Sequence, residues 1–461
     1  MSMKTLKKIL IRQEFPGRSL NFFLENRIWI IVGLSIFLLA LFYRSWENFT
    51  HPGLYMEDPA YFSGYYGGYQ PFMAVFNTSR GYVNLIINVY AWIVAKVDVR
   101  IQPGLYLIFA ILTGITTAVN LIFSGLFKSR PILLIAPLVL GLTGMNHVFY
   151  YMTLIYQFYT TTLLLLCLLF FPLPRTKSGL VGMAALFTIL PWSGPYSVLA
   201  IPVGILLLLF FRDRWKSFMI ILMISSTLLY YTTVKGGTTM FGNIFNRWVL
   251  SYYYHVLFKD IFFLGLLGEP TIVKSGIFLV CLAALFYLQR NDPAYIKLSF
   301  TMLVLIVAAL APYFLSKKIY HLHLDACYLL ISYFFWLVFL LYSLDIFFLR
   351  SSLKQIPALF AFFFLVFVAF DNYPLERKRI PIQEKMPAFL RTVYHYEKLA
   401  LEKKNRFIKL QYKEFYFKPT ALVGSRQMDA VHVGADFFKI PYGRQFIVHP
   451  AVSPERKSLN E

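Results

Sequence analysis

The chain has 461 residues, of which 58% are hydrophobic, 19% aromatic and only 14% charged, and its formal net charge is +22. Soluble domains carry about 25% charged residues, so this composition excludes an ordinary water-soluble fold and indicates a membrane protein. The apolar runs lack the alternation of barrel strands, which favours helical spans. The three cysteines lie in or at the edge of these runs, which argues against a disulfide framework.

The apolar runs predict about eleven transmembrane helices in an all-α polytopic membrane protein. A basic N-terminus precedes the first run, and no small-residue cleavage site follows it, so we expect the first span to be retained. In chain order the spans are expected at residues 28–43, 104–126, 132–145, 158–173, 179–191, 196–211, 217–233, 275–288, 298–315, 326–344 and 355–370.

The segment GYVNLIINVYAWIVAKV, residues 81–97, decides the topology. If it lies along the membrane surface as an interfacial helix, the basic connections such as FKSRP, PRTKSG and RDRWK join the N-terminus in the cytoplasm, as the positive-inside rule requires. We therefore predict that it does not span. The segments expected outside are 44–103, 146–157, 191–197, 234–274, 316–325 and the tail from 372, which together hold all eight histidines.

The tail predicts a small extracytoplasmic α/β domain at residues 372–461, after a catalytic membrane domain at 1–371. FIKLQYKEFYF and FKIPYGRQFIVHP have the composition of short strands bounded by Pro and Gly. The tail carries 17 of the 44 lysines and arginines against nine acids, so it should attract anionic headgroups or an anionic polymer. The alternative is a basic solubilising tail.

The stretch LYMEDPAYFSGYY contains Glu57 and Asp58, the only adjacent pair among the acids of the outer loops before the tail. Neighbours in sequence point different ways, so one can face a cavity while the other supports it. Asp58 before Pro59 also suits the N-cap of a helix. The acids of these loops are Glu47, Glu57, Asp58, Asp98, Asp260, Glu269 and Asp325.

The basic residues of the same loops could hold a lipid phosphate near the interface. The preferred candidates are Arg80, Lys317 and Lys318, with Arg247 in FNRWVLSYYYH as a further one, and contact with lipid headgroups is the alternative. His321 and His323 form a weak metal-ligand pattern with Asp325, but interfacial histidines are the favoured interpretation. The sequence contains no Walker-type loop, Gly-x-Ser-x-Gly, paired-cysteine motif or dinucleotide fingerprint.

MEDPAYF and the following SRGYVNLIINVYAWIVAKV resemble the acidic first-loop motif and interfacial stretch of the GT-C superfamily of integral-membrane glycosyltransferases. Protein O-mannosyltransferases and the lipid A aminoarabinose transferases belong to this superfamily. The resemblance implies an inverting transferase that moves a sugar from a polyprenyl-phosphate donor to an acceptor hydroxyl on the outer face. The acceptor could be a glycan, a lipid or a protein, membrane lipids are further partners, and no nucleic acid is expected.

Carried over by position, the resemblance implies that Asp58 is the general base and that Glu57 supports it. Arg80 or the Lys317 and Lys318 pair would stabilise the leaving phosphate. The side chains that would contact the sugar or acceptor are Tyr61, Tyr65, His321 and His323, with Tyr55 and Tyr66 near them.

One departure from the family concerns metal. Metal-dependent members carry further acids in the second outer loop, and GMNHVFYYMTLIYQFYT has none, so a metal-independent enzyme without a cofactor is expected. The alternatives are a lipid-linked-sugar flippase or other transporter, a polysaccharide polymerase, and a non-catalytic assembly subunit. The expected location is a bacterial inner membrane, with the N-terminus cytoplasmic and the C-terminal domain periplasmic.

Overall fold

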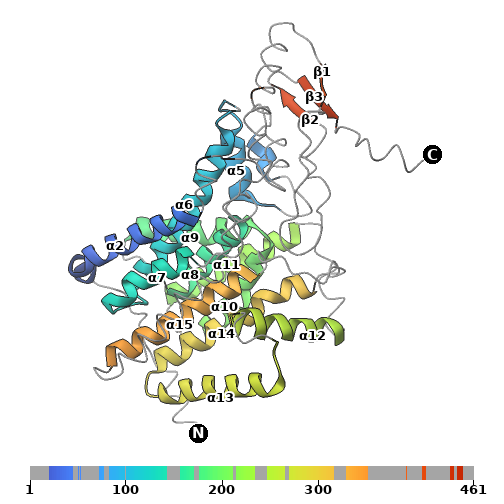
Figure 1. Ribbon diagram of the computed structural model, residues 1–461. Coiled ribbons are helices and arrows are strands. Elements are labelled where there is room, and N and C mark those ends of the chain that lie inside the picture. The colour runs from blue at the N-terminus through green and yellow to red at the C-terminus, as the bar shows by residue number, and fades with distance from the viewer. Residues whose placement is uncertain are drawn as a thin grey trace.

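The structure is a computed structural model in which most described residues are helical (Figure 1). It describes residues 20–44, 50, 52, 72–76, 83–98, 100–142, 156–170, 176–210, 214–233, 247–264, 269–315, 329–350, 391, 407–411, 437–440 and 444–449.

Most helices lie where the apolar runs predict them, and α12 (Arg247–Val256) is an exception within the expected outer loop at 234–274. They are α2 (Leu20–Arg44), α5 (Leu85–Val94), α6 (Gln102–Phe123), α7 (Arg130–Leu142), α8 (Tyr156–Phe170), α9 (Lys177–Ile189), α10 (Ala200–Phe210), α11 (Arg214–Thr233), α12 (Arg247–Val256), α13 (Ile272–Leu288), α14 (Pro293–Leu315) and α15 (Leu330–Arg350). Shorter segments are the 3-10 helices η2 (Phe72–Phe76), η5 (Leu190–Ser193) and η6 (Pro195–Leu199) and the π-helix η7 (Leu257–Phe262). The run at 355–370 lies outside the described residues.

Side-chain caps fix where several helices begin. The Thr176 hydroxyl accepts a hydrogen bond from the Gly179 amide at 3.2 Å and starts α9. In the same way, the Thr271 hydroxyl accepts a hydrogen bond from the Lys274 backbone amide at 3.2 Å, at the start of α13. Each cap satisfies an amide at a helix start that has no partner within the helix.

Asp345 caps α7 from another helix, α15. Its carboxylate is 1% exposed. Its two oxygens accept the backbone amides of Lys128 and Ser129, each at 2.8 Å, and the Ser129 hydroxyl at 2.5 Å. The end of α15 is therefore tied to the connection between α6 and α7.

The contacts between α2 and α7 show that the two helices run in the same direction. The Arg130 guanidinium lies 6.0 Å from the Trp29 ring centre, and eleven residues further along α2, Ala40 packs against Leu138. Residue numbers therefore rise together along the pair.

The helices α14 and α15 run in opposite directions. The Tyr295 and Ser343 hydroxyls are 3.0 Å apart, and the Ser332 hydroxyl donates to the Ile306 carbonyl at 2.8 Å. The Phe210 and Phe300 rings, with centroids 6.2 Å apart, bring the end of α10 beside the first third of α14. Since α11 begins soon after α10 ends, its start belongs to the same side.

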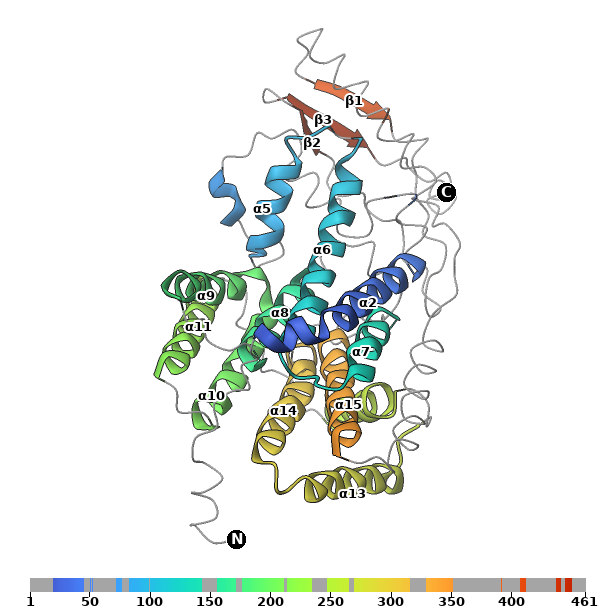
Figure 2. The same ribbon diagram turned by 90° about the vertical axis from the view of Figure 1, so that its left-hand side faces the viewer.

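These directions define two ends of the packed helices. We call one the basic end: the starts of α2, α7, α11 and α14 and the end of α15. We call the other the turn end: η5, η6, the start of α5 and the last residues of α9 and α11. In both views α5 and the first part of α6 project from the packed helices toward the strands (Figures 1 and 2).

Three short strands lie in the tail, and the small α/β domain expected there stays a prediction. β1 (Phe407–Gln411), β2 (Phe437–Ile440) and β3 (Arg444–His449) form a sheet in the order β1-β3-β2. β1 pairs with β3 in parallel and β2 pairs with β3 antiparallel.

One described helical segment, Gln102–Ile122 of α6, is long and apolar enough by length and composition to cross a membrane. Six shorter apolar segments in the described part of the chain have 10–17 residues each. The coarse expectation of a mainly helical protein is confirmed, and the number of membrane crossings stays a prediction.

Candidate functional site

Most of the side chains proposed from the sequence lie outside the described residues. Arg247 is described: it is the first residue of α12 and is exposed. The proposed residues outside the described part of the chain are Glu57, Asp58, Tyr61, Tyr65, Arg80, Lys317, Lys318, His321 and His323.

The chain on either side of the acidic stretch is attached to α6 and α5. A Cβ built at Gly104, in the first turn of α6, would lie 3.8 Å from Cγ of Pro52. After the stretch, the Phe72 ring packs edge-on against Trp92 of α5, with centroids 5.3 Å apart. The Asn88 amide also donates to the Val75 carbonyl at 2.8 Å. Both attachments are to the projecting helices.

The start of α5 is held at the turn end. The buried Tyr230 hydroxyl, on α11, donates to the Val83 carbonyl at 3.2 Å. The Tyr230 ring also meets Trp192 of η5 edge-on, with centroids 5.8 Å apart. The start of α5 therefore packs beside the PWSGPYS turn, which the sequence places outside as well.

Side-chain hydrogen bonds fix the backbone of that turn. Trp192 donates through Nε1 to the Ser226 hydroxyl at 3.2 Å, and Ser226 donates to the Thr188 carbonyl at 2.7 Å. The Tyr231 hydroxyl donates to the Pro195 carbonyl, and the Ser197 hydroxyl donates to the Gly194 carbonyl. The turn is held on both sides of Gly194.

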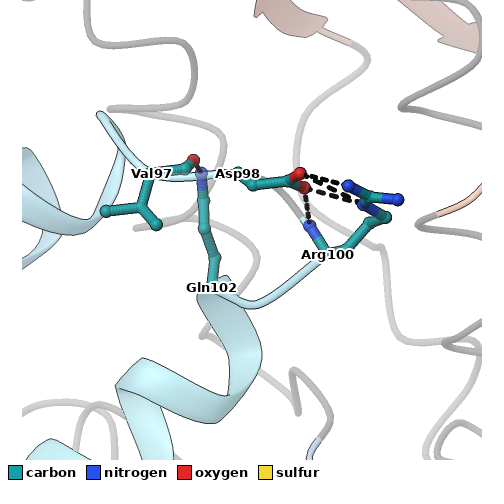
Figure 3. Close-up of polar contacts among 4 residues, drawn as sticks. All are labelled: Val97, Asp98, Arg100 and Gln102. Atoms are coloured by element: carbon teal, nitrogen blue, oxygen red, sulfur yellow. Dashed lines mark hydrogen bonds and ion pairs between the residues drawn. The ribbon is translucent and has the colours of Figure 1, made fainter.

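In the connection between α5 and α6, both carboxylate oxygens of Asp98 accept hydrogen bonds from Arg100 (Figure 3). Asp98 accepts the Arg100 backbone amide at 2.9 Å and its guanidinium at 2.5–3.1 Å. The hydrogen bond from the Arg100 side chain is the main reason that the pKa of Asp98 lies below its usual value. Asp98 is therefore a poor general base.

A second group of ionisable side chains joins α12, η7 and the start of α13. Glu269 accepts His255 Nε2 at 2.9 Å through one carboxylate oxygen and the Lys259 ammonium through the other. Lys274 donates to the Glu269 backbone carbonyl at 3.2 Å. The hydrogen bond with Lys259 lowers the pKa of Glu269 and raises that of Lys259. Both carboxylate oxygens of Glu269 thus have a basic partner, so Glu269 is also a poor general base.

Asp260 differs from these two acids. It lies half-buried in the π-helix η7. Burial is the main reason that the pKa of Asp260 is raised, and this effect exceeds the opposite effect of the positive charge on Lys259. Isolated π-helical turns occur often at functional sites. Among the described acids of the outer loops, Asp260 is the one whose protonation is best suited to a general base.

The cluster of His255, Lys259 and Glu269 was not predicted from the sequence, where each of these residues was considered singly. His255 and Lys259 are four residues apart, a spacing that places side chains on one face of a helix, and this spacing was the available signal. Within the described part of the chain, no group of three or more His, Cys, Asp or Glu residues could hold a metal ion.

Comparison of the chain with protein-family models and with curated proteins finds no match.

Proposed function

We propose that this chain is an integral-membrane inverting glycosyltransferase of the GT-C type that uses a polyprenyl-phosphate sugar donor. The observation that carries the proposal is the attachment of the acidic first-loop stretch. The chain enters it at Pro52 beside α6 and leaves it at Phe72 beside α5. Six peptide units separate Pro52 from Asp58, a contour length of about 20 Å. The acidic stretch is therefore flanked on both sides by contacts with the two projecting helices, the first turn of α6 and the last part of α5.

The helix directions support the proposed membrane orientation. Because α2 and α7 run in the same direction and α6 leads directly into α7, one crossing between α2 and α7 satisfies the geometry, and α6 supplies it. The segment at 81–97 then stays on one side, as an interfacial helix should. The basic end would face the cytoplasm, in agreement with the positive-inside rule.

In the proposed reaction, Asp58 takes the proton of the acceptor hydroxyl as that oxygen attacks the anomeric carbon from the face opposite the phosphate. The bond from the anomeric carbon to the phosphate oxygen breaks, and the polyprenyl phosphate leaves with the electron pair. Glu57 supports Asp58. The cations proposed for the leaving phosphate are Arg80, Lys317, Lys318 and Arg247, and the residues proposed for the sugar or acceptor are Tyr61, Tyr65, His321 and His323.

The proposed location is a bacterial inner membrane, with residues 372–461 forming a small domain outside it. The strands β1, β2 and β3 support the strand content of this domain. Single cysteines in a cysteine-free background test the orientation with a membrane-impermeant maleimide. We expect Lys96→Cys, at the end of α5, to react from the outside and Lys177→Cys, at the start of α9, to react only after the membrane is opened.

The activity is tested with purified protein and a labelled polyprenyl-phosphate hexose, with and without a chelator. Asp58→Asn should lower transfer by about a hundredfold to ten-thousandfold, as loss of a general base does. Asp260→Asn is the matched control, since it removes the one candidate base that lies among the described residues. If Asp260→Asn abolishes transfer while Asp58→Asn does not, the base is Asp260.

The same variants separate the enzyme from the alternatives. A flippase should move lipid-linked sugar across vesicles equally well with Asp58→Asn, whereas a polymerase should lengthen a lipid-linked oligosaccharide. A requirement for a divalent metal would contradict the metal-independent part of the proposal.

A further inference from the structure

The helix α12 packs beside an apolar segment of α14. Its Tyr253 hydroxyl donates a hydrogen bond to the Val307 carbonyl. Val307 belongs to the apolar segment Tyr295–Leu310. It lies 14 residues after Pro293, where α14 begins at the basic end. Because a helix rises about 1.5 Å per residue, this contact is about 21 Å from the basic end.

The π-helix η7 lies at the same level. Its Phe262 ring meets the Trp336 ring of α15 with centroids 5.0 Å apart. Trp336 belongs to the apolar segment Leu330–Ile346 and lies 14 residues before Arg350, where α15 ends at the basic end. This contact is again about 21 Å from the basic end. The hydrocarbon layer of a bilayer is about 30 Å thick, so a bilayer that α14 and α15 cross from the basic end reaches the level of α12 and η7.

Large apolar side chains are exposed on α12 and at the start of α13. Trp248 and Leu250 of α12 are 85% and 54% exposed. Ile272 and Val273, the first two residues of α13, are 88% and 70% exposed. We call these four side chains the outer apolar patch. Exposed apolar side chains at a depth that a bilayer reaches are expected to contact lipid.

Cations accompany the outer apolar patch on both helices. Arg247 precedes Trp248 in α12, Lys274 follows Val273 in α13, and both cations are exposed. Tryptophan next to arginine or lysine is typical of the boundary between lipid chains and headgroups, where the cation reaches the phosphates.

The other ionisable side chains between these helices have opposite partners. The Glu269 carboxylate contacts His255 through one oxygen and Lys259 through the other. Charged side chains close to hydrocarbon are costly unless they pair with one another, and this cluster is paired. The composition of the region therefore suits the edge of a bilayer.

We infer that α12 and the start of α13 lie in the bilayer surface, at the boundary between lipid chains and headgroups in the leaflet farther from the basic end. The partner is phospholipid: the outer apolar patch contacts its chains, and Arg247 and Lys274 meet its phosphates. This inference rests on the membrane insertion contained in the proposed function. It moves part of the expected outer loop at 234–274 from water into the membrane surface. The phosphate of a polyprenyl donor would lie at the same level, in agreement with the role proposed for Arg247.

The experiment places nitroxide labels on single cysteines in the full-length, cysteine-free protein, held in lipid nanodiscs. The test positions are Trp248→Cys and Ile272→Cys. Oxygen, which dissolves in lipid chains, and a water-soluble nickel complex report the surroundings of each label. Ile277→Cys, at a 61% exposed position in the apolar part of α13, is the lipid control, and Lys177→Cys, at the exposed start of α9, is the water control. We expect both test labels to collide with oxygen as often as the lipid control and with nickel far less than the water control.

Three results would overturn the inference. Nickel collisions as frequent as those of the water control would place the patch in water. Few collisions with either reagent would show that protein covers it, either this chain or a second copy. If the lipid control itself reports water, the membrane part of the proposed function fails as well. Since the measurement uses no donor, failure of sugar transfer alone leaves the inference standing.

The double variant Arg247→Gln, Lys274→Gln tests the contact with phosphates. Melting temperatures are compared in nanodiscs of phosphatidylcholine with and without phosphatidylglycerol. Wild type should gain stability from the anionic lipid, and the double variant should gain less, with a difference that shrinks in salt. The exchange Arg247→Lys, Lys274→Arg keeps both charges and should keep the gain. Equal gains for wild type and the glutamine variant, or the same gain from inorganic phosphate alone, would refute the contact with lipid phosphates.

Discussion

Gly33 of α2 lies against the backbone of α7: a Cβ built at Gly33 would be 2.5 Å from the Leu133 carbonyl oxygen and 3.2 Å from Cγ of Pro137. Real Cβ atoms do not approach a carbonyl oxygen so closely. We therefore expect Gly33→Ala to force the two helices apart and to lower the free energy of unfolding by about 1–3 kcal/mol. Thermal unfolding in detergent measures this.

The matched control is Gly182→Ala in α9, where a built Cβ meets no heavy atom within 4 Å. Alanine is favoured over glycine in a helix by about 0.8–1.0 kcal/mol, so this variant should be neutral or slightly stabilised. Equal losses for both variants would contradict the close contact between α2 and α7.

Asp345 should be the most sensitive acid among the described residues. Asp345→Ala leaves the amides of Lys128 and Ser129 without their acceptor, and we expect a loss of about 2–4 kcal/mol. Ser129→Ala removes one of the three hydrogen bonds and should cost about 0.5–1.5 kcal/mol. Denaturation of both variants checks the order, and an Asp345→Ala protein as stable as wild type would refute the cap.

Tyr230→Phe should loosen the start of α5 without disturbing the ring packing. The change removes the donor to the buried Val83 carbonyl, which we expect to cost about 1–3 kcal/mol. Hydrogen exchange should speed up in residues 83–94. Tyr287→Phe, at an exposed position on α13, is the control and should leave this exchange unchanged.

Lys259 and Glu269 should be coupled energetically, and more strongly than Lys274 and Glu269, because Lys274 acts on the Glu269 carboxylate only through its charge. Lys259→Met and Glu269→Gln break the same ion pair, so the double variant should lose little more than either one. Lys274→Met breaks a bond to the Glu269 backbone carbonyl, so its effect should nearly add to that of Glu269→Gln. Melting temperatures of the single and double variants give both couplings, and an additive Lys259 and Glu269 pair would contradict the contact.

The pH dependence of this coupling follows from the two pKa shifts. The lowered pKa of Glu269 means that its contribution is lost only as pH falls through that lowered value. The raised pKa of Lys259 means that its contribution is lost only as pH rises through the raised value. Both members of the pair therefore stay charged between about pH 5 and pH 9, so the coupling should persist across this range and should weaken with salt.

Apart from α12, the helices were predictable because each contains an apolar run bounded by basic or turn residues, and such runs are visible in a single sequence. The segment that forms α12 lies in an expected outer loop, because RWVLSYYYHV mixes apolar, aromatic and polar residues and is no long apolar run. The contacts of His255 and Lys259 with Glu269 join side chains fourteen and ten residues apart, for which the sequence holds no local pattern.

Long-range partners were not predictable. Asp345 lies 217 residues from Lys128, and no local pattern near either residue records their contact. Glu57 and Asp58 were singled out by their adjacency in the first outer loop and by the resemblance of MEDPAYF to a family motif. They lie outside the described residues, so their role stays a prediction.

The turn between α9 and α10 also bears on how a ligand would bind. Pro191 and Pro195 fix two backbone angles, Gly194 takes a conformation that few residues reach, and the neighbouring carbonyls are already bonded. The backbone of this turn has thus already lost its conformational entropy during folding. A molecule that binds beside it gives up only its own freedom of motion, and the protein contributes no further ordering there.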